Sequence, residues 1–271
     1  MFENFGGTRI PFVKASACGN DFLIIDGIYA KDEKRELTRR LCDRNNGVGA
    51  DGVEWIRRDA ERDAVVDLVN ADGSPAEVSG NGTRCVAAYL AAESGKQRLV
   101  IGTGAGDKVC LLRRRDRATF VFRSEMGTPH VGEPFALKLQ TGAVQGTPVG
   151  MGNPHYIIFC TEYPQDWRRI AMEVQRQEAA FHGGVNVEFV RVTGPSSVEI
   201  RIFERGAGET LSSGTGTSAA AVASLVAHKV EGPLVHVASP GGEQTVEWAG
   251  GEAGLILEGP AEIICEGVYF G

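Results

Sequence analysis

The chain has no run of eighteen apolar residues, and its opening Met1-Phe2-Glu3-Asn4 lacks the basic segment and apolar stretch of a secretory signal. The first absence excludes a membrane-spanning helix, and the second predicts a cytoplasmic protein. Positive charge is also scarce, because 28 lysines and arginines stand against 35 aspartates and glutamates, for a net charge of -7. Neither a nucleic acid nor an anionic membrane is therefore expected as the main partner.

Cysteine is present but unpatterned: the six cysteines are scattered along the chain and form no C-x-x-C pair. Zinc and thiol redox motifs therefore find no support, and reduced thiols are expected. Apolar residues make up 42% and charged residues 23% of the 271 residues. These values are typical of a folded globular protein with one large domain or two small ones.

Glycine is abundant, with 36 residues, about twice the usual share. Short runs rich in Val, Ile and Phe, bounded by Gly, Pro, Asn or Asp, predict strands; they are 11–14, 22–25, 52–56, 64–69, 99–101, 108–112, 118–123, 155–160, 187–192, 197–203, 234–237, 244–248 and 254–258. Four segments predict helices, at 33–43, 82–93, 167–181 and 217–229. Because strands outnumber helices and do not alternate with them, the pattern favours the α+β class.

The chain contains a degenerate internal repeat. Ser79-Gly80-Asn81-Gly82-Thr83 precedes one Ala-rich helix, and Ser213-Gly214-Thr215-Gly216-Thr217 precedes another, 134 positions later. Gly19-Asn20 recurs as Gly152-Asn153, and Gly47-Val48-Gly49 has a looser counterpart in Gly184-Val185-Asn186. Three elements in the same order at nearly one offset indicate two homologous halves. We expect one half over 1–127, joined by a returning strand at 261–271, and the other over 128–260.

Each half offers one S-G-x-G-T loop at the start of a helix, where unpaired N–H groups and the helix dipole favour an anion. Two such halves facing a common cleft place Ser79 and Ser213 on opposite sides of a bound carboxylate. That arrangement suits a racemase or epimerase, in which one group removes an α-proton and the other returns a proton on the opposite face. Dinucleotide binding is the rival interpretation, because 214–219 match G-x-G-x-x-A. It is disfavoured since no acidic residue ends a strand about twenty residues later.

These residues carry a resemblance to the diaminopimelate epimerase family and its cofactor-independent relatives. The matching blocks, in family order, are Gly19-Asn20-Asp21-Phe22, Gly47-Val48-Gly49-Ala50-Asp51-Gly52, Asn70-Ala71-Asp72-Gly73-Ser74, Ser79-Gly80-Asn81-Gly82-Thr83-Arg84-Cys85, Met151-Gly152-Asn153-Pro154-His155, Val185-Asn186, Glu204-Arg205-Gly206-Ala207-Gly208-Glu209-Thr210 and Ser213-Gly214-Thr215-Gly216. The resemblance implies two pseudo-symmetric halves, each a curled, mainly antiparallel sheet around a central helix. It also implies interconversion of LL- and meso-diaminopimelate in a homodimer, without pyridoxal phosphate, metal or nucleotide.

The resemblance further implies the site residues. Substrate is held by Asn20, Asn70, Gly80, Asn81, Asn153, Asn186, Glu204, Arg205, Gly214 and Thr215. Arg205 can bind a carboxylate with two parallel hydrogen bonds, and asparagine amides can both donate and accept. His155 and Glu204 are expected to tune or relay protons beside the two base positions.

Two departures from the family pattern bear on activity. The catalytic bases of the family are cysteines, and their positions hold Ser79 and Ser213; the His-Gly usually found before Gly-Asn-Asp-Phe is Ser16-Ala17. A thiol has a pKa near ~8.5, whereas a serine hydroxyl resembles water at ~15.7. The gap is about 10 kcal/mol at ~1.36 kcal/mol per pKa unit. Cys85, six residues beyond Ser79, is expected to be a packed thiol and not a substitute base.

We therefore expect activity that is weak, absent or altered, and three explanations remain open. The serines replace cysteines by engineering in an otherwise ordinary epimerase, or they serve a natural branch with a related reaction. That branch would be a lyase or dehydratase, or a racemase of another amino acid. In the third explanation the chain is a catalytically silent amino-acid-binding protein.

Overall fold

The computed structural model describes residues 8–30 and 33–271. The chain divides into two compact units, one of Met1–Ser124 with Pro260–Gly271 and one of Glu125–Gly259. The sequence-based division lay at 127/128 and 260/261, within a few residues of these positions. The absence of a secretory signal was expected from residues 1–4, which lie outside the described residues. Within the described part, no helix is both long and apolar enough to span a membrane.

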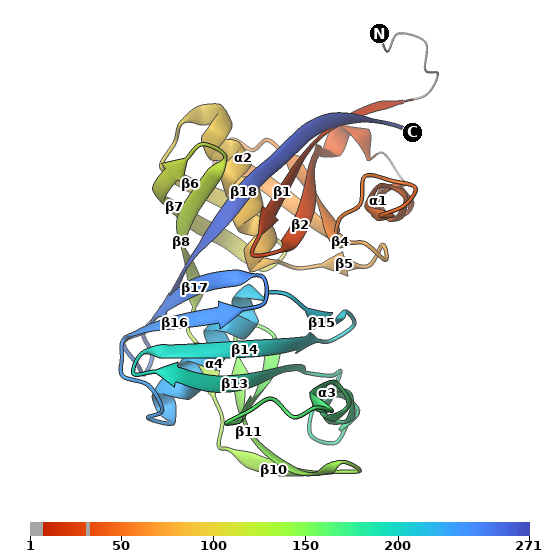
Figure 1. Cartoon of the computed structure of the whole chain (residues 1–271). Coiled ribbons are helices and arrows are strands. Elements are labelled where there is room, and N and C mark those ends of the chain that lie inside the picture. The colour runs from red at the N-terminus through yellow and green to blue at the C-terminus, as the bar shows by residue number, and fades with distance from the viewer. Residues whose placement is uncertain (1–7, 31–32) are drawn as a thin grey trace. The chain divides into compact units, whose positions relative to one another are not determined.

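The first unit is a curled sheet with one helix inside it and one outside (Figure 1). Its strands are β1 (Arg9–Ala17), β2 (Asn20–Asp26), β3 (Gly52–Arg57), β4 (Ala64–Asn70), β5 (Pro75–Ala76), β6 (Arg98–Thr103), β7 (Gly106–Asp116), most of β8 (Thr119–Gly127) and the end of β18 (Leu255–Phe270). Its helices are α1 (Lys34–Cys42), α2 (Gly80–Ser94) and a short 3-10 helix, Gly27–Tyr29. Pairs β2–β3 and β4–β6 are parallel. Pairs β1–β2, β1–β18, β3–β4, β4–β5, β6–β7 and β7–β8 are antiparallel.

Helix α2 is the centre of this unit. Ten of its 15 residues are buried, so it is buried on all sides, unlike an amphipathic surface helix. Its alanines allow β1, β2, β6 and β7 to approach closely, and Phe120, Phe122 and Leu99 complete the core around it. The helix ends at Gly95, whose φ of 72° is the left-handed conformation that glycine adopts without a Cβ penalty.

Helix α1 covers the outer face of the same sheet. Its Leu41 packs with Leu23, Ile25 and Trp55 in a second cluster. The Trp55 indole N–H donates to Thr38 Oγ1 at 3.0 Å, and both residues are fully buried. This hydrogen bond matters because a buried donor without a partner destabilises the fold.

We predict that Thr38→Val lowers the free energy of unfolding by about 1–2 kcal/mol, because the valine leaves the buried Trp55 N–H without an acceptor. Urea denaturation of the whole chain measures the change. Thr38→Ser keeps the hydroxyl and serves as the control, with a smaller loss. A loss in Thr38→Ser as large as that in Thr38→Val would contradict the prediction, because the hydroxyl would then matter no more than the methyl group.

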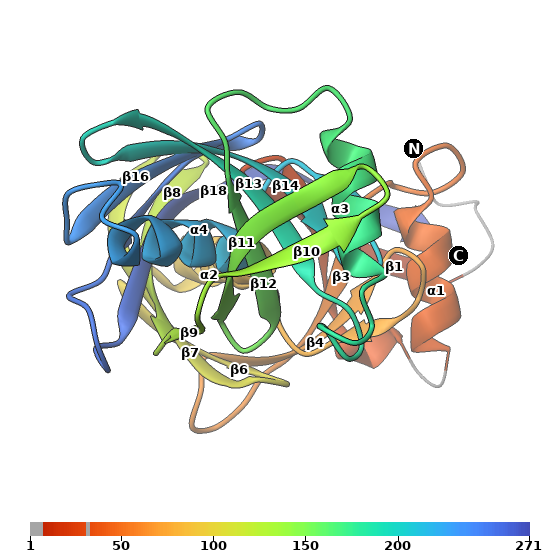
Figure 2. The same cartoon turned by 90° about the horizontal axis from the view of Figure 1, so that it is seen from below.

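The second unit repeats this plan. Its strands are β9 (His130–Val131), β10 (Phe135–Leu139), β11 (Gly142–Gly150), β12 (Pro154–Phe159), β13 (Asn186–Gly194), β14 (Ser197–Glu204), β15 (Gly208–Thr210), β16 (Leu234–Ser239), β17 (Gly242–Glu247) and the start of β18. Its helices are α3 (Trp167–Gln175) and α4 (Gly214–Val226). Helix α4 is central and contacts β11 to β14, β16 and β17, and Figure 2 shows it in blue among these strands. Helix α3 packs outside, through Trp167, Ala171 and Val174.

The expected α+β class, with a mainly antiparallel sheet around one helix in each half, is confirmed. The structure differs in detail: five strands, β5, β9, β10, β11 and β15, were not predicted, and α3 ends at Gln175 instead of Phe181. Strand β11 was not predicted because it contains Gly142, Gly146, Gly150 and Pro148, which are residue types typical of loops. At Gly146 glycine is needed because a Cβ there would lie 2.5 Å from the Tyr156 ring.

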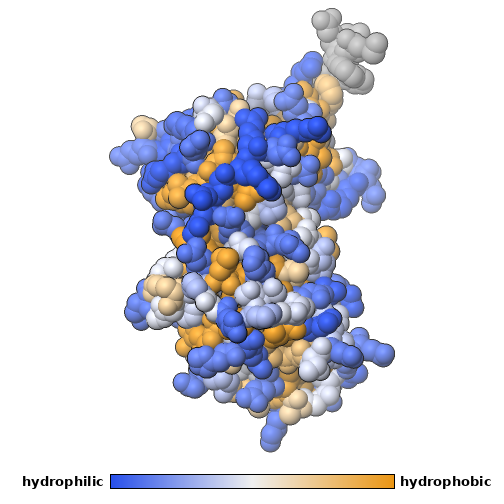
Figure 3. Space-filling model, turned by 60° about the vertical axis from the view of Figure 1, so that its left-hand side comes forward, coloured by the Kyte–Doolittle hydropathy of each residue, from blue (hydrophilic) through white to orange (hydrophobic). Residues whose placement is uncertain are grey.

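Figure 3 shows hydrophilic side chains over most of the visible surface, with smaller apolar areas between them. The six cysteines are free thiols, four of them buried. Cys85 is fully buried within α2, and burial raises the pKa of its thiol strongly. It is therefore a packed thiol, which is the structural role the sequence predicted for it.

Candidate functional site

The two predicted base positions have the same structure in the two units. Ser79 and Ser213 are the N-cap residues of α2 and α4, each in an extended conformation. Ser79 Oγ accepts from the Gly82 N–H at 3.1 Å, and Ser213 Oγ accepts from the Gly216 N–H at 3.2 Å. The helices thus begin immediately after the serines, two and three residues earlier than predicted. Their first N–H groups have no partner within the helix and face away from it, which favours an anion.

A buried glutamate lies against each of these helix starts. Glu54 on β3 is 2% exposed and Glu188 on β13 is fully buried. A Cβ on Gly82 would lie 1.9 Å from Glu54 Oε1, and a Cβ on Gly216 would lie 2.6 Å from Glu188 Oε1. The last glycine of each S-G-x-G loop therefore gives room to a carboxylate. Ser79 Cβ lies 3.3 Å from the position that a Cβ on Gly82 would take, and Ser213 Cβ lies 3.2 Å from the corresponding position on Gly216.

The two glutamates occupy equivalent places in the repeat. Glu54 pairs with Ile24 between the parallel strands β2 and β3, and Glu188 pairs with Ile157 between the parallel strands β12 and β13. They are also 134 positions apart, the offset of the two serines. Neither glutamate was predicted as a site residue from the sequence, although the repeat, extended to single residues, pairs the two positions.

The surroundings of the two glutamates differ. Glu188 Oε1 lies 2.7 Å from His155 Nδ1, and His155 Nε2 lies 2.9 Å from Asn153 Oδ1. The residue that corresponds to His155 in the repeat is Phe22, which offers no polar atom. Within the described residues no hydrogen bond or ion pair reaches Glu54, and burial alone raises its pKa to about 8.

In the first unit the asparagines form a chain of contacts. Asn81 Nδ2 donates to Asn20 Oδ1 at 3.3 Å, and Asn20 Nδ2 donates to Asp51 at 2.6 Å. Arg84, fully buried on α2, donates to Asn81 Oδ1 at 2.5 Å. The amides of Asn20 and Asn81 are therefore held in fixed orientations.

Beside Asn20, Asp21 is bound by two cations, Lys14 at 2.9 Å and Arg44 at 2.8 Å. Burial tends to raise the Asp21 pKa, but the hydrogen bonds from Arg44 and Lys14 outweigh it, so the pKa is lowered. This carboxylate is an anchor for the Gly19-Asn20 turn and stays charged. Asn70, at the end of β4, instead donates to Ser74 Oγ at 3.1 Å and closes its own turn.

In the second unit, hydrogen bonds link most of the predicted site residues to one another. Asn153 Nδ2 donates to Thr215 Oγ1 at 3.3 Å; these positions correspond to Asn20 and Asn81, where the donor is instead Asn81 on the helix. Asn186 Oδ1 accepts from the Arg205 backbone N–H at 2.9 Å. The exposed Arg205 guanidinium reaches the Gly183 carbonyl at 2.6 Å through one nitrogen, which leaves its other donors for a ligand.

Glu204 ends β14 beside Ser213. Burial raises the Glu204 pKa, and the hydrogen bond with the Ser213 hydroxyl lowers it in part. The residue in the same place in the first unit is Asn70, 134 positions earlier at the end of β4. An amide cannot accept a proton as a carboxylate does, so this position is chemically asymmetric between the units.

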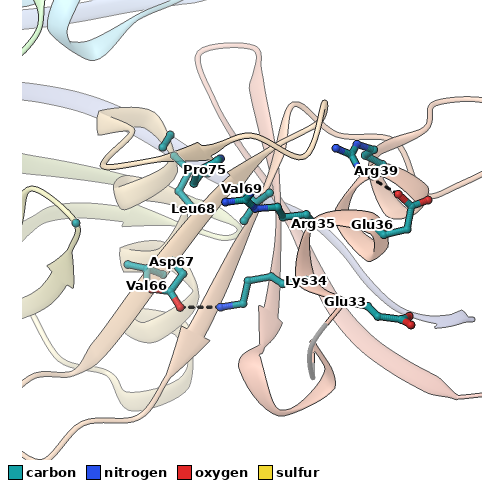
Figure 4. Close-up of a pocket in the computed structure, with 12 residues that line it drawn as sticks. Glu33, Lys34, Arg35, Glu36, Arg39, Val66, Asp67, Leu68, Val69 and Pro75 are labelled. Carbon is teal, nitrogen blue, oxygen red and sulfur yellow. Dashed lines mark hydrogen bonds and ion pairs between the residues drawn. The ribbon is translucent and has the colours of Figure 1, made fainter.

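A surface pocket of the first unit lies elsewhere, between α1 and strands β4 and β5 (Figure 4). Two ion pairs occupy its polar side chains, Lys34–Asp67 at 2.7 Å and Arg39–Glu36 at 2.9 Å. None of the predicted site residues lines it. Among residues 8–30 and 33–271, no group of three His, Cys, Asp or Glu side chains is arranged to hold a metal ion.

Comparison with known proteins agrees with these features. The family model described as diaminopimelate epimerase matches residues 12–131 and 147–264. Curated relatives include a diaminopimelate epimerase of Elusimicrobium minutum, 35% identical over 96% of this chain and 99% of its own length, and one of Methanothrix thermoacetophila, 38% identical over 96% of each.

Solved structures with the same fold are more distant in sequence. A hydroxyproline epimerase of Agrobacterium vitis superposes with a TM-score of 0.72 at 18% identity, covering 96% of this chain and 91% of that one. A predicted epimerase of Pseudomonas aeruginosa gives 0.72 at 14% identity, covering 96% and 98%. The family match spans both units and every block that carries the two serines, and the chain belongs to the diaminopimelate epimerase family.

Proposed function

We propose that this protein is an amino-acid epimerase that interconverts LL- and meso-diaminopimelate by moving one α-proton. Each unit supplies one proton-transfer group, Ser79 from the first and Ser213 from the second. The observation that carries the proposal is the matched pair of helix starts, each with a serine cap, a glycine and a buried glutamate. Its family membership over nearly the whole chain supports the substrate.

Substrate binding follows from the donors near these serines. The backbone N–H groups of Gly80, Asn81, Gly214 and Thr215 bind the carboxylate of the reacting centre. Arg205 binds the carboxylate at the other end of the substrate. The amides of Asn20, Asn70, Asn153 and Asn186 orient the ammonium groups and the remaining oxygens.

Proton movement needs groups that can hold a proton near the serines. Glu204 does so beside Ser213, and His155, fixed by Glu188 and Asn153, tunes or relays protons. No pyridoxal phosphate, metal or nucleotide takes part in the proposed reaction. We further propose that the protein works in the cytoplasm as a homodimer.

A ligand-binding protein without turnover is the second candidate. The observation that favours it is serine at both base positions, because a hydroxyl is a far weaker base than a thiol. This candidate shares the substrate contacts but not the proton transfer, so one experiment separates the two.

The test is α-proton exchange of meso-diaminopimelate in D₂O followed by NMR, with calorimetric binding measured alongside. We expect binding together with slow exchange at the reacting centre. L-Lysine, which lacks the second carboxylate, is the control and should show neither. Binding without exchange would favour the ligand-binding protein, and neither binding nor exchange would overturn the substrate assignment.

A further inference from the structure

We propose that Asp51 is a positioning residue that fixes the Asn20 amide, so that the Asn20 carbonyl oxygen faces the helix start that carries Ser79. The inference rests on the proposed function and deepens it, because it assigns a polarity to one of the substrate-binding amides. It starts from a chain of hydrogen bonds in the first unit, which runs from Arg84 through Asn81 and Asn20 to Asp51.

The direction of this chain is set by the chemistry of its two ends. A guanidinium can only donate, so Arg84 binds the Oδ1 of Asn81. A carboxylate can only accept, so Asp51 Oδ2 binds the Nδ2 of Asn20 at 2.6 Å. Between the two ends, Asn81 Nδ2 donates to Asn20 Oδ1 at 3.3 Å. Turning either amide over would place two donors or two acceptors against each other, so both orientations are determined.

The Asp51 carboxylate is itself held in place. Its Oδ1 accepts from Arg44 at 2.7 Å, and its Oδ2 also accepts from the backbone N–H of Asp21 at 3.0 Å. The backbone of Asp51 is fixed as well, because its N–H donates to the Asp21 carbonyl and its carbonyl accepts from the Ala71 N–H, both at 2.9 Å. The carboxylate therefore keeps one position beside the Gly19-Asn20 turn.

The second unit holds its equivalent asparagine the other way round. His155 Nε2 lies 2.9 Å from Asn153 Oδ1, so the ring donates there, and Asn153 Nδ2 donates to Thr215 Oγ1 at 3.3 Å. The other ring nitrogen lies 2.7 Å from the buried Glu188 carboxyl, with a proton between them. Donation therefore runs from the helix toward β3 in the first unit, and from β12 toward the helix in the second.

Two differences within the repeat produce this reversal. Asp51 immediately precedes β3, and the residue that immediately precedes β13 is Val185, which has no polar side-chain atom. His155 on β12 corresponds to Phe22 on β2. Each unit thus has a polar group that orients its asparagine, but at a different position and with the opposite hydrogen-bonding character.

The two asparagines are consequently suited to ligand groups of opposite charge. Both are half-buried, and each keeps hydrogen-bonding capacity, because an amide oxygen has two lone pairs and an amide nitrogen has two hydrogens. Beside its helix start, Asn20 presents an oxygen and therefore accepts from an ammonium group of the substrate. Asn153 presents an N–H beside its own helix start and therefore donates to a carboxylate oxygen.

The role is tested with two ligands, meso-diaminopimelate and pimelate, which has the two carboxylates but neither ammonium group. Calorimetry measures diaminopimelate binding, and competition measures pimelate binding. Asp51→Val, which introduces the residue type of the second unit, should weaken diaminopimelate binding about fivefold, the size of one hydrogen bond. Pimelate binding should change less than about twofold. Asp51→Asn keeps an acceptor oxygen and is the control, with less than about twofold loss for either ligand.

Two outcomes of the binding experiment would overturn the proposal. Equal losses of both ligands in Asp51→Val would show a merely structural role. Equal losses of diaminopimelate in Asp51→Val and Asp51→Asn would show that the charge of Asp51, and not its acceptor oxygen, is what matters. Thermal unfolding of the two variants must show that both are folded.

Hydrogen exchange of side-chain amides, followed by NMR of the ¹⁵N-labelled native chain, tests the orientation without a variant. Diaminopimelate should slow exchange at Asn153 Nδ2 but not at Asn20 Nδ2, and slowing at Asn20 Nδ2 would overturn the proposal. In the free protein, Asn20 Nδ2 should exchange faster in Asp51→Val than in the native chain. If diaminopimelate does not bind, the substrate assignment falls, and these free-protein rates still decide whether Asp51 fixes the amide.

Discussion

Replacing both serines by cysteine, as Ser79→Cys and Ser213→Cys, should raise the rate of α-proton exchange about a thousandfold, the middle of the range for a well-placed general base. A thiol has a pKa about seven units below a hydroxyl, and the N-terminus of a helix lowers it further. Both serines are N-caps of central helices, so both cysteines gain this effect. NMR of meso-diaminopimelate in D₂O measures the rate.

The single variants are the controls for this prediction. Because inversion needs a group on each face, each single cysteine should give less inversion than the pair. Each cysteine also loses the serine cap, at about 1 kcal/mol of stability, so thermal unfolding must confirm that the proteins are folded. A double variant that is folded, binds substrate and exchanges no faster than the native chain would show that the serines are already activated bases.

Gly82→Ala should destabilise the chain by about 3 kcal/mol or more, although alanine favours a helix over glycine by up to ~1 kcal/mol. The new methyl group would lie 1.9 Å from Glu54 Oε1. Glu54 has little room to move, since it is 2% exposed and lies between two paired strands. Overpacking of a filled core costs about 1–3 kcal/mol, and displacing a buried carboxyl adds to that. Urea denaturation measures the loss.

A double-mutant cycle with Glu54→Ala identifies the cause. If the carboxylate is the obstacle, Gly82→Ala should cost at least about 2 kcal/mol less when Glu54 is already alanine, a coupling typical of residues in contact. Gly254→Ala is the neutral control, because nothing lies within 4 Å of its Cβ position. Additive losses from Gly82→Ala and Glu54→Ala would contradict the proposed contact.

The family was predictable from the sequence, and so were the local structures that carry the proposed site residues, because they depend on local chemistry. The S-G-x-G-T loops, the Gly-Asn turns and the Ala-rich helices are short patterns whose geometry is set within a few residues. Their repetition at one offset indicated two halves with one central helix each. Strands such as β11 escaped prediction because Gly146 and Pro148 resemble loop residues, and their place is decided by Tyr156 from the neighbouring strand.

Tertiary structure alone decided which carboxyl groups lie against the glycines of the two serine-capped helix starts. In the sequence, Glu54 and Glu188 look like ordinary strand residues. In the structure, strand register and sheet curvature place them against the first turns of α2 and α4. The sequence by itself determined that each unit has a helix start capped by serine. Only the packing of β3 and β13 against those helices determined that Glu188 meets His155, while no hydrogen bond or ion pair from the described residues reaches Glu54, because such contacts join residues that are about 30 positions apart.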